Sequence, residues 1–405
     1  MAVDTDRASR NLDVVLLGAT GFTGGLVADY LAEHAPGDLR WAIAGRSAGK
    51  LEAVRSRLAD RNPGLAELPL LIADSADEAG LAALAAQTKV VATTVGPYLQ
   101  HGGPLVAACA AAGTDYIDLT GEPEFVDKMY VAHNATAEKT GARLVHACGF
   151  DSIPHDLGAY FTITQLAAEA GGEITDPVRM RGVVRAGAGM SGGTFHSAMT
   201  AFSRAKQMRD ATQARRRIEP RPDGRRSRAI AGRPTRDSSL GYWLLPLPTI
   251  DPFVVARSGA ALSSYGPDFS YSHFAGTKTL RYAAGGAAGV SGMLVAAQVP
   301  PLRNLLLKRV PQGSGPSERQ REKSWFTVDF TASTEPSSGE QVTVSTRVSG
   351  GDPGYTETAK MFAESAMCLA LDDLPDSSGQ VTTATAMGDA LLGRLQAAGI
   401  AFERR

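Results

Sequence analysis

An apolar segment that ends in three glycines constrains the fold of this chain more than any other feature. Residues 13–17 are followed by Gly18, Gly21 and Gly24, after which the sequence continues as an Ala- and Leu-rich helical pattern. Dinucleotide-binding domains need glycines at such a strand-to-helix turn for a tight bend, for close approach of a pyrophosphate and for helix packing. The helix N-terminus then offers its amides to the phosphates. The cofactor-binding residues predicted in this turn are Gly18, Thr20, Gly21, Phe22, Thr23 and Gly24.

Strand and helix patterns alternate through the first third of the chain. Strand-like segments lie near residues 13, 40, 68, 89, 115 and 143, and helical patterns lie near residues 24, 48, 78, 103 and 124. Such alternation is typical of a parallel sheet covered by helices on both faces. We therefore expect a protein of the α/β class, in which residues 1–153 form a Rossmann-like, doubly wound, NADP-binding domain.

The ends of the later strands supply further candidates, because ligands lie at the carboxyl ends of parallel strands. Arg46 and Ser47 suit the 2′-phosphate of NADP(H), and the alternative is a surface arginine in a loop. Asp74 is expected either near the adenine or as the cap of the next helix. After the fourth strand come Thr94, Gly96 and Pro97, which are expected near the diphosphate or the nicotinamide ribose.

The pattern changes after residue 153. Residues 178–186, 325–332 and 341–348 alternate in the manner of antiparallel strands, and a helix is expected from about residue 191 to residue 208 with Thr194 as its N-cap. Residues 154–350 are therefore predicted to form a mixed α+β substrate domain. Two amphipathic helices in residues 351–405 are expected to pack back on the Rossmann domain.

Two segments of the predicted second domain have unusual compositions. Residues 204–236 hold twelve Lys and Arg against three acids, which predicts a mobile, solvated loop or, alternatively, an anion-facing patch for an acidic protein or a lipid head group. Residues 283–299 carry no charge and are rich in Ala, Gly and Val. That length is at the lower limit for a bilayer span, about 17 residues. A buried or interfacial segment is expected, with peripheral membrane or lipid contact as the alternative.

Composition and cysteine usage exclude several classes of protein. The 405 residues carry a net charge of −1, which disfavours a nucleic-acid-binding protein. The three cysteines show no CxxC or Cys/His spacing and no HExxH motif occurs, so neither a metal centre nor a disulfide framework is expected. The N-terminus lacks the apolar core of a signal peptide, which favours a cytoplasmic protein. A homodimer is compatible with the sequence, although no motif specifies one.

Segments along nearly the whole chain resemble the saccharopine dehydrogenase-like oxidoreductases. They include the glycine-rich turn, residues 112–122, residues 148–157, the Ser191-Gly192-Gly193-Thr194 segment and residues 386–392. More narrowly, the chain resembles the mycobacterial-type trans-acting enoyl reductases. The resemblance implies a Rossmann domain with a mixed-sheet domain. It also implies reduction of a carbon-carbon double bond in an acyl chain carried by a polyketide synthase, during the synthesis of complex envelope lipids.

Reduction of an α,β-unsaturated thioester needs a group that stabilises an enolate and a proton donor for the α-carbon. By its position at a strand end, Tyr98 is the first choice as donor to the thioester oxygen, and Ser152 or His155 is the second. Alternatively, Tyr98 lines the pocket without taking part in the reaction, and Ser152 caps the helix that begins near residue 154. Glu122, at another strand end, is expected to bind substrate or to hold its loop.

Other activities have weaker support. None of the ten tyrosines has a lysine four residues later, so the dyad of short-chain dehydrogenases is absent. A serine hydrolase would rest on residues 189–193 alone, a formal GxSxG match. An oxidoreductase acting on an amino or keto acid is an alternative, for which Arg181, Arg185 and Arg257 would have to converge on substrate carboxylates. A non-catalytic, NADPH-bound, lipid-associated protein is a third hypothesis.

Overall fold

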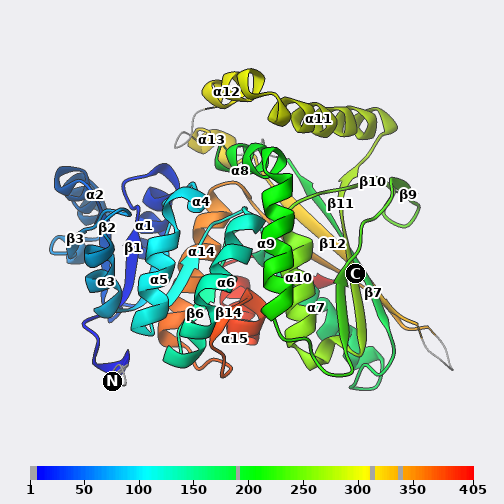
Figure 1. Ribbon diagram of the computed structural model, residues 1–405, viewed down its shortest axis with the longest axis horizontal. Helices are drawn as coiled ribbons and strands as arrows, with labels where there is room; N and C mark the ends of the chain where they lie inside the picture. Colours follow the sequence, from blue (N-terminus) through cyan, green and yellow to red (C-terminus); the bar gives the residue numbers. More distant parts are fainter. Residues whose placement is uncertain (1–6, 188–191, 311–314, 336–340) are drawn as a thin grey trace.

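The computed structural model describes residues 7–187, 192–310, 315–335 and 341–405 (Figure 1). Within these residues, seven strands form an all-parallel sheet in the order β14-β6-β5-β4-β1-β2-β3. This is the doubly wound order expected of a dinucleotide-binding domain, with one added strand. The strands are β1 Leu12–Leu17, β2 Trp41–Gly45, β3 Leu70–Ile72, β4 Thr88–Thr93, β5 Asp115–Asp118, β6 Arg143–Val145 and β14 Gly379–Val381.

Both faces of this sheet are buried, which explains the near-continuous apolar strands in the sequence. On β1, Val14 and Leu16 enter one apolar core, whereas Val15 and Leu17 enter the core on the opposite face. Such two-sided burial is typical of a parallel sheet wound with helices. The helices of this part are α1 Phe22–His34, α2 Ala48–Arg61, α3 Glu78–Ala86, α4 Tyr98–His101, α5 Gly103–Ala112 and α6 Pro123–Thr140, with short 3-10 turns at Arg7–Ser9 and Pro63–Leu65.

The second sheet is mixed, as predicted. Its order among the described residues is β15-β13-β12-β7-β11-β10-β9, with β8 paired to β11. Strand β11 runs parallel to β7 and β8, and the other pairs are antiparallel. The strands are β7 Val178–Ala186, β8 Arg226–Ala229, β9 Thr235–Asp237, β10 Tyr242–Pro246, β11 Asp268–Thr277, β12 Phe326–Thr334, β13 Thr343–Gly350 and β15 Ala401–Arg404.

Helices cover this second sheet and connect it to the first domain. Helix α7 follows β6 directly and packs on β12 and β13. Helix α8 begins at Gly192, two residues before the predicted cap Thr194, whose side chain lies outside the described residues. The helices are α7 Ile153–Glu169, α8 Gly192–Ser203, α9 Ala205–Ile218, α10 Asp251–Ala261, α11 Leu280–Gln298, α12 Pro300–Arg309 and α13 Glu318–Arg321, with a 3-10 turn at Ser263–Tyr265.

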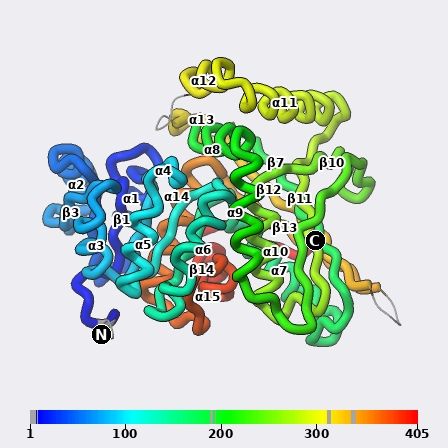
Figure 2. Tube along the Cα trace, in the orientation of Figure 1, coloured from blue at the N-terminus to red at the C-terminus, as the bar shows by residue number. Residues whose placement is uncertain are grey.

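The C-terminal helices return to the first domain, as predicted. Helix α14 (Thr356–Leu371) packs on α1 and β4, and α15 (Thr383–Ala397) packs on α7 and α14. The Arg143 side chain donates to the Leu369 carbonyl, and the Tyr30 hydroxyl donates to Glu364. The final strand β15 was not predicted, and it pairs with β13 of the second sheet. In Figure 2 these orange and red segments lie in the middle of the molecule, so each domain is discontinuous in the sequence.

The predicted mobile loop at residues 204–236 is wrong for most of its length. The segment contains α9, β8 and β9, and α9 packs along α6 of the first domain. The Arg204 guanidinium donates two hydrogen bonds of 2.7 Å to Glu124, and Arg215 pairs with Asp127 at 2.6 Å. The composition suggested solvation, but these two arginines instead bind carboxylates on the neighbouring helix.

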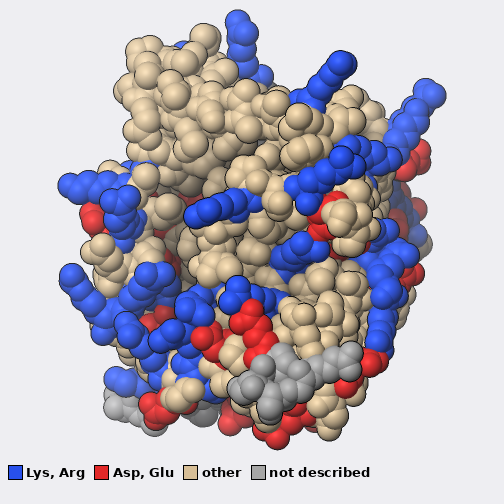
Figure 3. Space-filling model, turned by 90° about the vertical axis from the view of Figure 1, so that its right-hand side faces the viewer, with Lys and Arg blue, Asp and Glu red and all other residues tan. Residues whose placement is uncertain are grey.

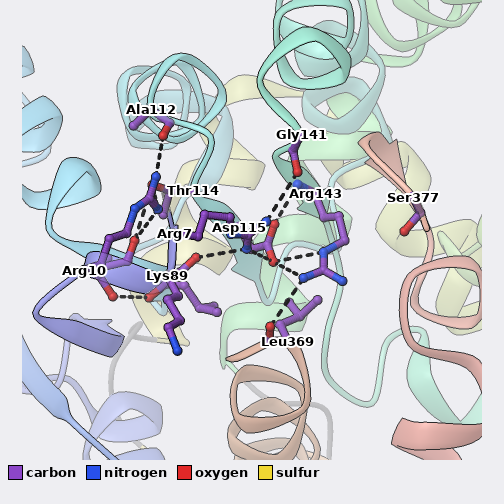
Figure 4. Close-up of polar contacts among 12 residues, drawn as sticks. Arg7, Arg10, Lys89, Ala112, Thr114, Asp115, Gly141, Arg143, Leu369 and Ser377 are labelled. Atoms are coloured by element: carbon purple, nitrogen blue, oxygen red, sulfur yellow. Dashed lines mark hydrogen bonds and ion pairs between the residues drawn. The ribbon is translucent and has the colours of Figure 1, made fainter. Parts of the chain in front are cut away.

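The described part of the N-terminus is also anchored. Arg10 is buried and donates to the Thr88 and Ala112 carbonyls at 2.6 Å. Figure 4 shows Arg7 and Arg143 converging on Asp115, a fully buried carboxylate at the start of β5. These contacts hold the segment before β1 against the amino-terminal edge of the sheet, opposite to the edge at which ligands bind.

The apolar segment 283–299 forms most of α11. Among the described helices, none is by itself long and apolar enough to cross a bilayer. Helices α11 and α12 meet that criterion only when they are taken together, and they are bent by 117° relative to one another. Figure 1 shows this pair as an arm above the body of the molecule.

Candidate active site

A pocket of about 640 Å³ lies at the carboxyl ends of β1, β4, β5 and β6. Strand β1 is paired with β2 on one side and β4 on the other, so the crevice opens at the point where the strand order reverses. This is where doubly wound sheets bind their ligands. The opposite wall comes from α7, β7, α8, β11 and the start of α14. The predicted site residues that line the pocket are Gly21, Phe22, Thr23, Gly24, Thr94, Gly96, Pro97, Tyr98 and His155.

The glycine-rich turn has the shape that a pyrophosphate needs. Gly18 has a φ of +97°, a conformation that residues with a Cβ rarely adopt. A Cβ at Gly24 would collide with the Gly18 carbonyl, so this glycine lets α1 approach the turn. Gly21 is the N-cap of α1 and makes no side-chain cap bond, which leaves the first amides of α1 to the pocket. Such amides bind phosphates, so the turn fits a dinucleotide.

The candidates for the adenosine half lie outside the pocket lining but on the same sheet edge. Arg46 is exposed at the end of β2, and Thr20 lies beside Gly45. The Ser47 hydroxyl accepts a 3.4 Å bond from the Lys50 amide and caps α2. Asp74 accepts from the Ala76 amide, whereas the following helix is capped by Asp77, so the capping alternative for Asp74 is wrong.

The Tyr98 hydroxyl is already engaged within the first domain. It donates to the Thr93 carbonyl and accepts from the Leu119 amide, both at 3.1 Å. The Glu122 carboxylate accepts from the Tyr98 and Leu99 amides at 3.1 and 2.9 Å and so holds this loop, one of the two roles expected for it. Burial raises the pKa of Tyr98 well above 10, which disfavours release of its proton. This geometry does not support the first choice of oxyanion donor.

A buried cluster on the opposite wall consists of His155 on α7, Asp251 at the start of α10 and His273 on β11. The Nδ1 atom of His155 lies 2.8 Å from Oδ1 of Asp251, and Nε2 of His273 lies 3.7 Å from Oδ2. The Nδ1 atom of His273 is 3.1 Å from the Tyr271 hydroxyl. Neither ring nitrogen of His155 forms a hydrogen bond of good geometry among the described residues, although Nδ1 lies close to Asp251. All three clustered side chains line the pocket.

The electrostatics of this wall follow from burial and proximity. Burial lowers the pKa of His273 to about 3, so this imidazole is neutral. Burial opposes ionisation of Asp251, but the adjacent His155 and His273 outweigh it and keep the pKa of Asp251 below its ordinary value. Burial, and then the charge of Asp251, raise the pKa of Asp151 to about 6. The pocket therefore holds one ionised carboxylate next to an imidazole, and a second carboxyl that titrates near neutral pH.

Sequence reasoning did not find Asp251 as a site residue, and it considered His273 only as a partner for a hydrolase. Neither residue stands in a recognisable motif, and both reach His155 through the fold of the second domain. One ligand atom from each of these three side chains lies within 4.8 Å of the others, so the set could hold a divalent cation. The expectation of no metal centre rested on cysteine spacing and on HExxH, which cannot detect such a group.

The remaining sequence candidates do not reach the pocket. Ser152 is fully buried and is the N-cap of α7, but it makes no side-chain cap bond and does not line the pocket. Among the proposed carboxylate-binding residues, Arg181 pairs with Asp237, Arg185 donates to Tyr242, and Arg257 pairs with Glu219. The serine of the GxSxG match lies outside the described residues.

The pocket lining contains acidic residues but no Lys or Arg among the described residues. Glu122, Asp151 and Asp251 are among its lining residues, and no Lys or Arg occurs among the lining residues that the structure describes. Arg321 lies outside the lining, with its guanidinium 5.7 Å from the centre of the Phe22 ring beside the glycine-rich turn. A carboxylate substrate would find no Lys or Arg side chain among the described lining residues, whereas an uncharged substrate has no need of one.

The strand order, the glycine-rich turn and the pocket at the switch point define an oxidoreductase of the Rossmann type that uses NADP(H). Residues 14–145 match the model of the saccharopine dehydrogenase NADP-binding domain. The chain belongs to the saccharopine dehydrogenase-like oxidoreductase family. It is similar in sequence to mycobacterial proteins named trans-acting enoyl reductase.

Three mycobacterial relatives match this chain over nearly their whole length. The trans-acting enoyl reductases of Mycobacterium bovis and Mycobacterium ulcerans are 38% and 36% identical to it, and the match covers 97% of this chain and 97% of each relative. A provisionally named trans-acting enoyl reductase of Mycobacterium tuberculosis is 39% identical with the same coverage. Saccharopine dehydrogenase of Saccharomyces cerevisiae has a TM-score of 0.55 at 14% identity, over 97% of this chain and 99% of that one, a likeness of fold alone.

The stability of a variant at Asp151 tests the electrostatics of the pocket. Its pKa rises from an ordinary 3.8 to about 6 on folding, which corresponds to about 3 kcal/mol of destabilisation when the carboxylate is ionised. Because the folded pKa is the higher one, this penalty grows as pH rises from about 4 to 6 and is full above that range. The Asp151→Asn variant should therefore be more stable than the parent at pH 8 and equally stable near pH 3.

Urea unfolding at both pH values measures this difference. The matched control is Asp74→Asn, the same substitution at an exposed carboxylate, which should leave the stability of the protein unchanged. A parent and an Asp151→Asn variant with equal stability at pH 8 would show that Asp151 is not held in an unfavourable ionised state.

Proposed function

We propose that this protein reduces a carbon-carbon double bond in an acyl thioester with NADPH, and that a carrier domain of a polyketide synthase presents the acyl chain. The names of the mycobacterial relatives support the reaction class. The observation that carries the proposal is the pocket lining, which combines an unpartnered imidazole nitrogen with the absence of Lys and Arg among the described lining residues. Such a wall suits a neutral enoyl thioester better than an amino or keto acid.

Proton delivery is the task of His155 in this proposal. Bound NADPH supplies a hydride to the β-carbon, which leaves enolate charge on the thioester. An imidazolium at His155 would stabilise that charge and then donate the Nε2 proton to the α-carbon. The Asp251 carboxylate, with Oδ1 2.8 Å from Nδ1, holds the ring in its position. His273, which is neutral, cannot add a competing positive charge.

Treatment with a chelator distinguishes a proton relay from a metal site at the His155 cluster. Nδ1 and Oδ1 lie 2.8 Å apart, which is close enough for the direct contact that the proposed proton relay needs. We therefore expect incubation with a chelator, followed by desalting, to leave turnover unchanged. Loss of activity that added zinc restores would assign the cluster to metal binding instead.

We further propose that Arg46 selects NADP(H). Its guanidinium is exposed at the end of β2, beside the turn that holds the phosphates. The Arg46→Ala variant should weaken NADPH binding by about 10- to 100-fold, the usual worth of a charge-assisted hydrogen bond. NADH affinity should change little, because NADH lacks the 2′-phosphate. Calorimetric titration of both cofactors measures the ratio, and Arg61→Ala, at the other end of α2, is the matched control.

The amino or keto acid hypothesis lacks its required geometry. It needs two or more cations that converge on substrate carboxylates, but Arg181, Arg185 and Arg257 each bind a different partner away from the pocket lining. A non-catalytic, lipid-associated role is separated from an enzymatic one by turnover. The test is the loss of NADPH absorbance with a carrier-bound 2-enoyl thioester.

Oxidation of NADPH with the enoyl thioester, and no reduction of NADP+ with amino acids, is the result expected. Tight NADPH binding with no oxidation in the presence of several enoyl chain lengths would contradict the proposal and would favour the non-catalytic role. Reduction of NADP+ by an amino acid would assign the chain to the second class.

A further inference from the structure

Helices α11 and α12 form a bent, largely apolar arm on the surface, which we call the α11–α12 elbow (residues 280–309). From residue 282 to residue 302 the sequence contains no Asp, Glu, Lys or Arg. Large apolar side chains of the elbow face solvent: Tyr282 is 73% exposed, Val295 65%, Leu280 58% and Leu305 49%. A surface helix in a globular protein normally presents charged or polar side chains outward. A contiguous exposed apolar surface of this kind marks a site of interaction.

The elbow is fastened to the body by its inner side. Met199 of α8 forms a buried cluster with Ala296 and Ala297, and other side chains of both helices pack around it. The Gln298 side chain donates to the Phe202 carbonyl at 2.6 Å, and His196 lies 2.7 Å from the Val310 carbonyl. The exposed apolar side chains therefore belong to a helix pair with its own buried contacts.

The charge around the elbow has a single sign. No Asp or Glu occurs between residues 269 and 317, whereas five basic residues do: Lys278, Arg281, Arg303, Lys308 and Arg309. None of the five forms an ion pair with a residue that the structure describes. In Figure 3 the upper lobe is largely uncharged, and blue basic side chains project from it. An apolar surface with unpaired cations is complementary to a negatively charged partner that also offers an apolar interior.

We propose that the α11–α12 elbow docks on an anionic lipid surface and lies in the plane of the interface. Amphipathic elements bind membranes by burying apolar side chains at the boundary between head groups and acyl chains, while basic residues contact the anionic head groups. The 117° bend between the two helices prevents them from acting as one straight span. A second copy of the chain is a poorer occupant, because the same five cations on each copy would repel one another.

This location suits a protein whose substrate is an acyl chain. Helix α8, which carries the elbow on its outer side, contributes Gly193 and Ser197 to the pocket lining. Only one helix therefore separates the proposed lipid contact from the pocket. The proposal does not rest on the proposed reaction, because lipid binding can be measured without substrate.

Flotation of the full chain with lipid vesicles tests the proposal. The chain should bind vesicles that contain phosphatidylglycerol at least tenfold more tightly than vesicles of phosphatidylcholine alone, and high salt should weaken this binding. A variant that combines Val295→Asp with Leu305→Asp should lose at least tenfold in affinity. A variant that combines Arg281→Glu with Lys308→Glu should lose the preference for phosphatidylglycerol. Retained NADPH binding shows that each variant is folded.

The matched control is Ile72→Asp, which places the same substitution on an apolar side chain that is 61% exposed in the first domain and should leave vesicle binding unchanged. Absence of binding to either kind of vesicle would overturn the proposal, as would equal loss in the Ile72→Asp control. A parent dimer that becomes monomeric in the Val295→Asp and Leu305→Asp variant would overturn it in favour of a contact between two copies.

Discussion

The His155→Asn variant should reduce enoyl thioesters with a kcat that is lower by about two to four orders of magnitude, the usual worth of a positioned general acid. Asparagine can stay beside Asp251 in place of the Nδ1 side of the ring, but it lacks the Nε2 atom that donates the proton in this proposal. The affinity for NADPH should stay the same, because His155 lies on the wall opposite the glycine-rich turn. Stopped-flow absorbance at saturating substrate measures the change.

Tyr98→Phe is the informative companion to that variant. The Tyr98 hydroxyl bonds to the Thr93 carbonyl and the Leu119 amide, so its loss should destabilise the protein by about 1 to 3 kcal/mol. The kcat should fall less than about tenfold, well below the loss expected at His155. A large loss of kcat in Tyr98→Phe, with His155→Asn nearly unaffected, would restore tyrosine as the catalytic donor and contradict the assignment made here to His155.

The Gly24→Ala variant should lose NADPH binding by about 100-fold or more, an effect of at least 2.7 kcal/mol. A Cβ at this position would collide with the Gly18 carbonyl and would lie 2.7 Å from the Thr94 hydroxyl oxygen. Neither the backbone of the turn nor the end of β4 can yield without moving α1 away from the phosphate site. Isothermal calorimetry with NADPH measures the loss, and circular dichroism shows whether the fold persists.

Gly25→Ala is the matched control for this effect. It makes the same change one residue later in the same helix, where the nearest atoms to a new Cβ are 3.7 and 3.8 Å away, an ordinary contact distance. Alanine should even stabilise α1 slightly, because glycine is the poorer helix former. Equal loss of NADPH binding in both variants would show that the cost arises from the helix itself rather than from the approach of α1 to the turn.

The first domain could be predicted from the sequence because its signals are local. An apolar β1, three spaced glycines and a regular alternation of strands and helices specify a doubly wound sheet and its ligand-binding edge. The C-terminal helices were predicted to return because each has one apolar face. The strand β15 escaped detection because only four residues, Ala401–Arg404, form it, and its partner β13 is distant in the sequence.

The wall that holds the His155 cluster could not be predicted in the same way. Asp251 stands at the start of α10 and His273 in the middle of β11, and nothing in either local sequence points to His155. Their proximity is a product of tertiary packing. The prediction of a mobile loop at residues 204–236 was wrong for a related reason. Arg204 and Arg215 bind acidic residues of α6 that only the fold brings within reach. Tyr98 occupies the predicted place, but its hydroxyl points into the first domain.

The central claim is that this chain delivers a hydride from NADPH to an acyl double bond. NADPH deuterated at C4 of the nicotinamide, tested separately on each face, should transfer one deuterium to the β-carbon of a carrier-bound enoyl thioester, with the α-proton taken from solvent. Mass spectrometry of the saturated product measures this directly. A product without deuterium from either form, or an enoyl thioester left intact while NADPH is consumed, would contradict the account.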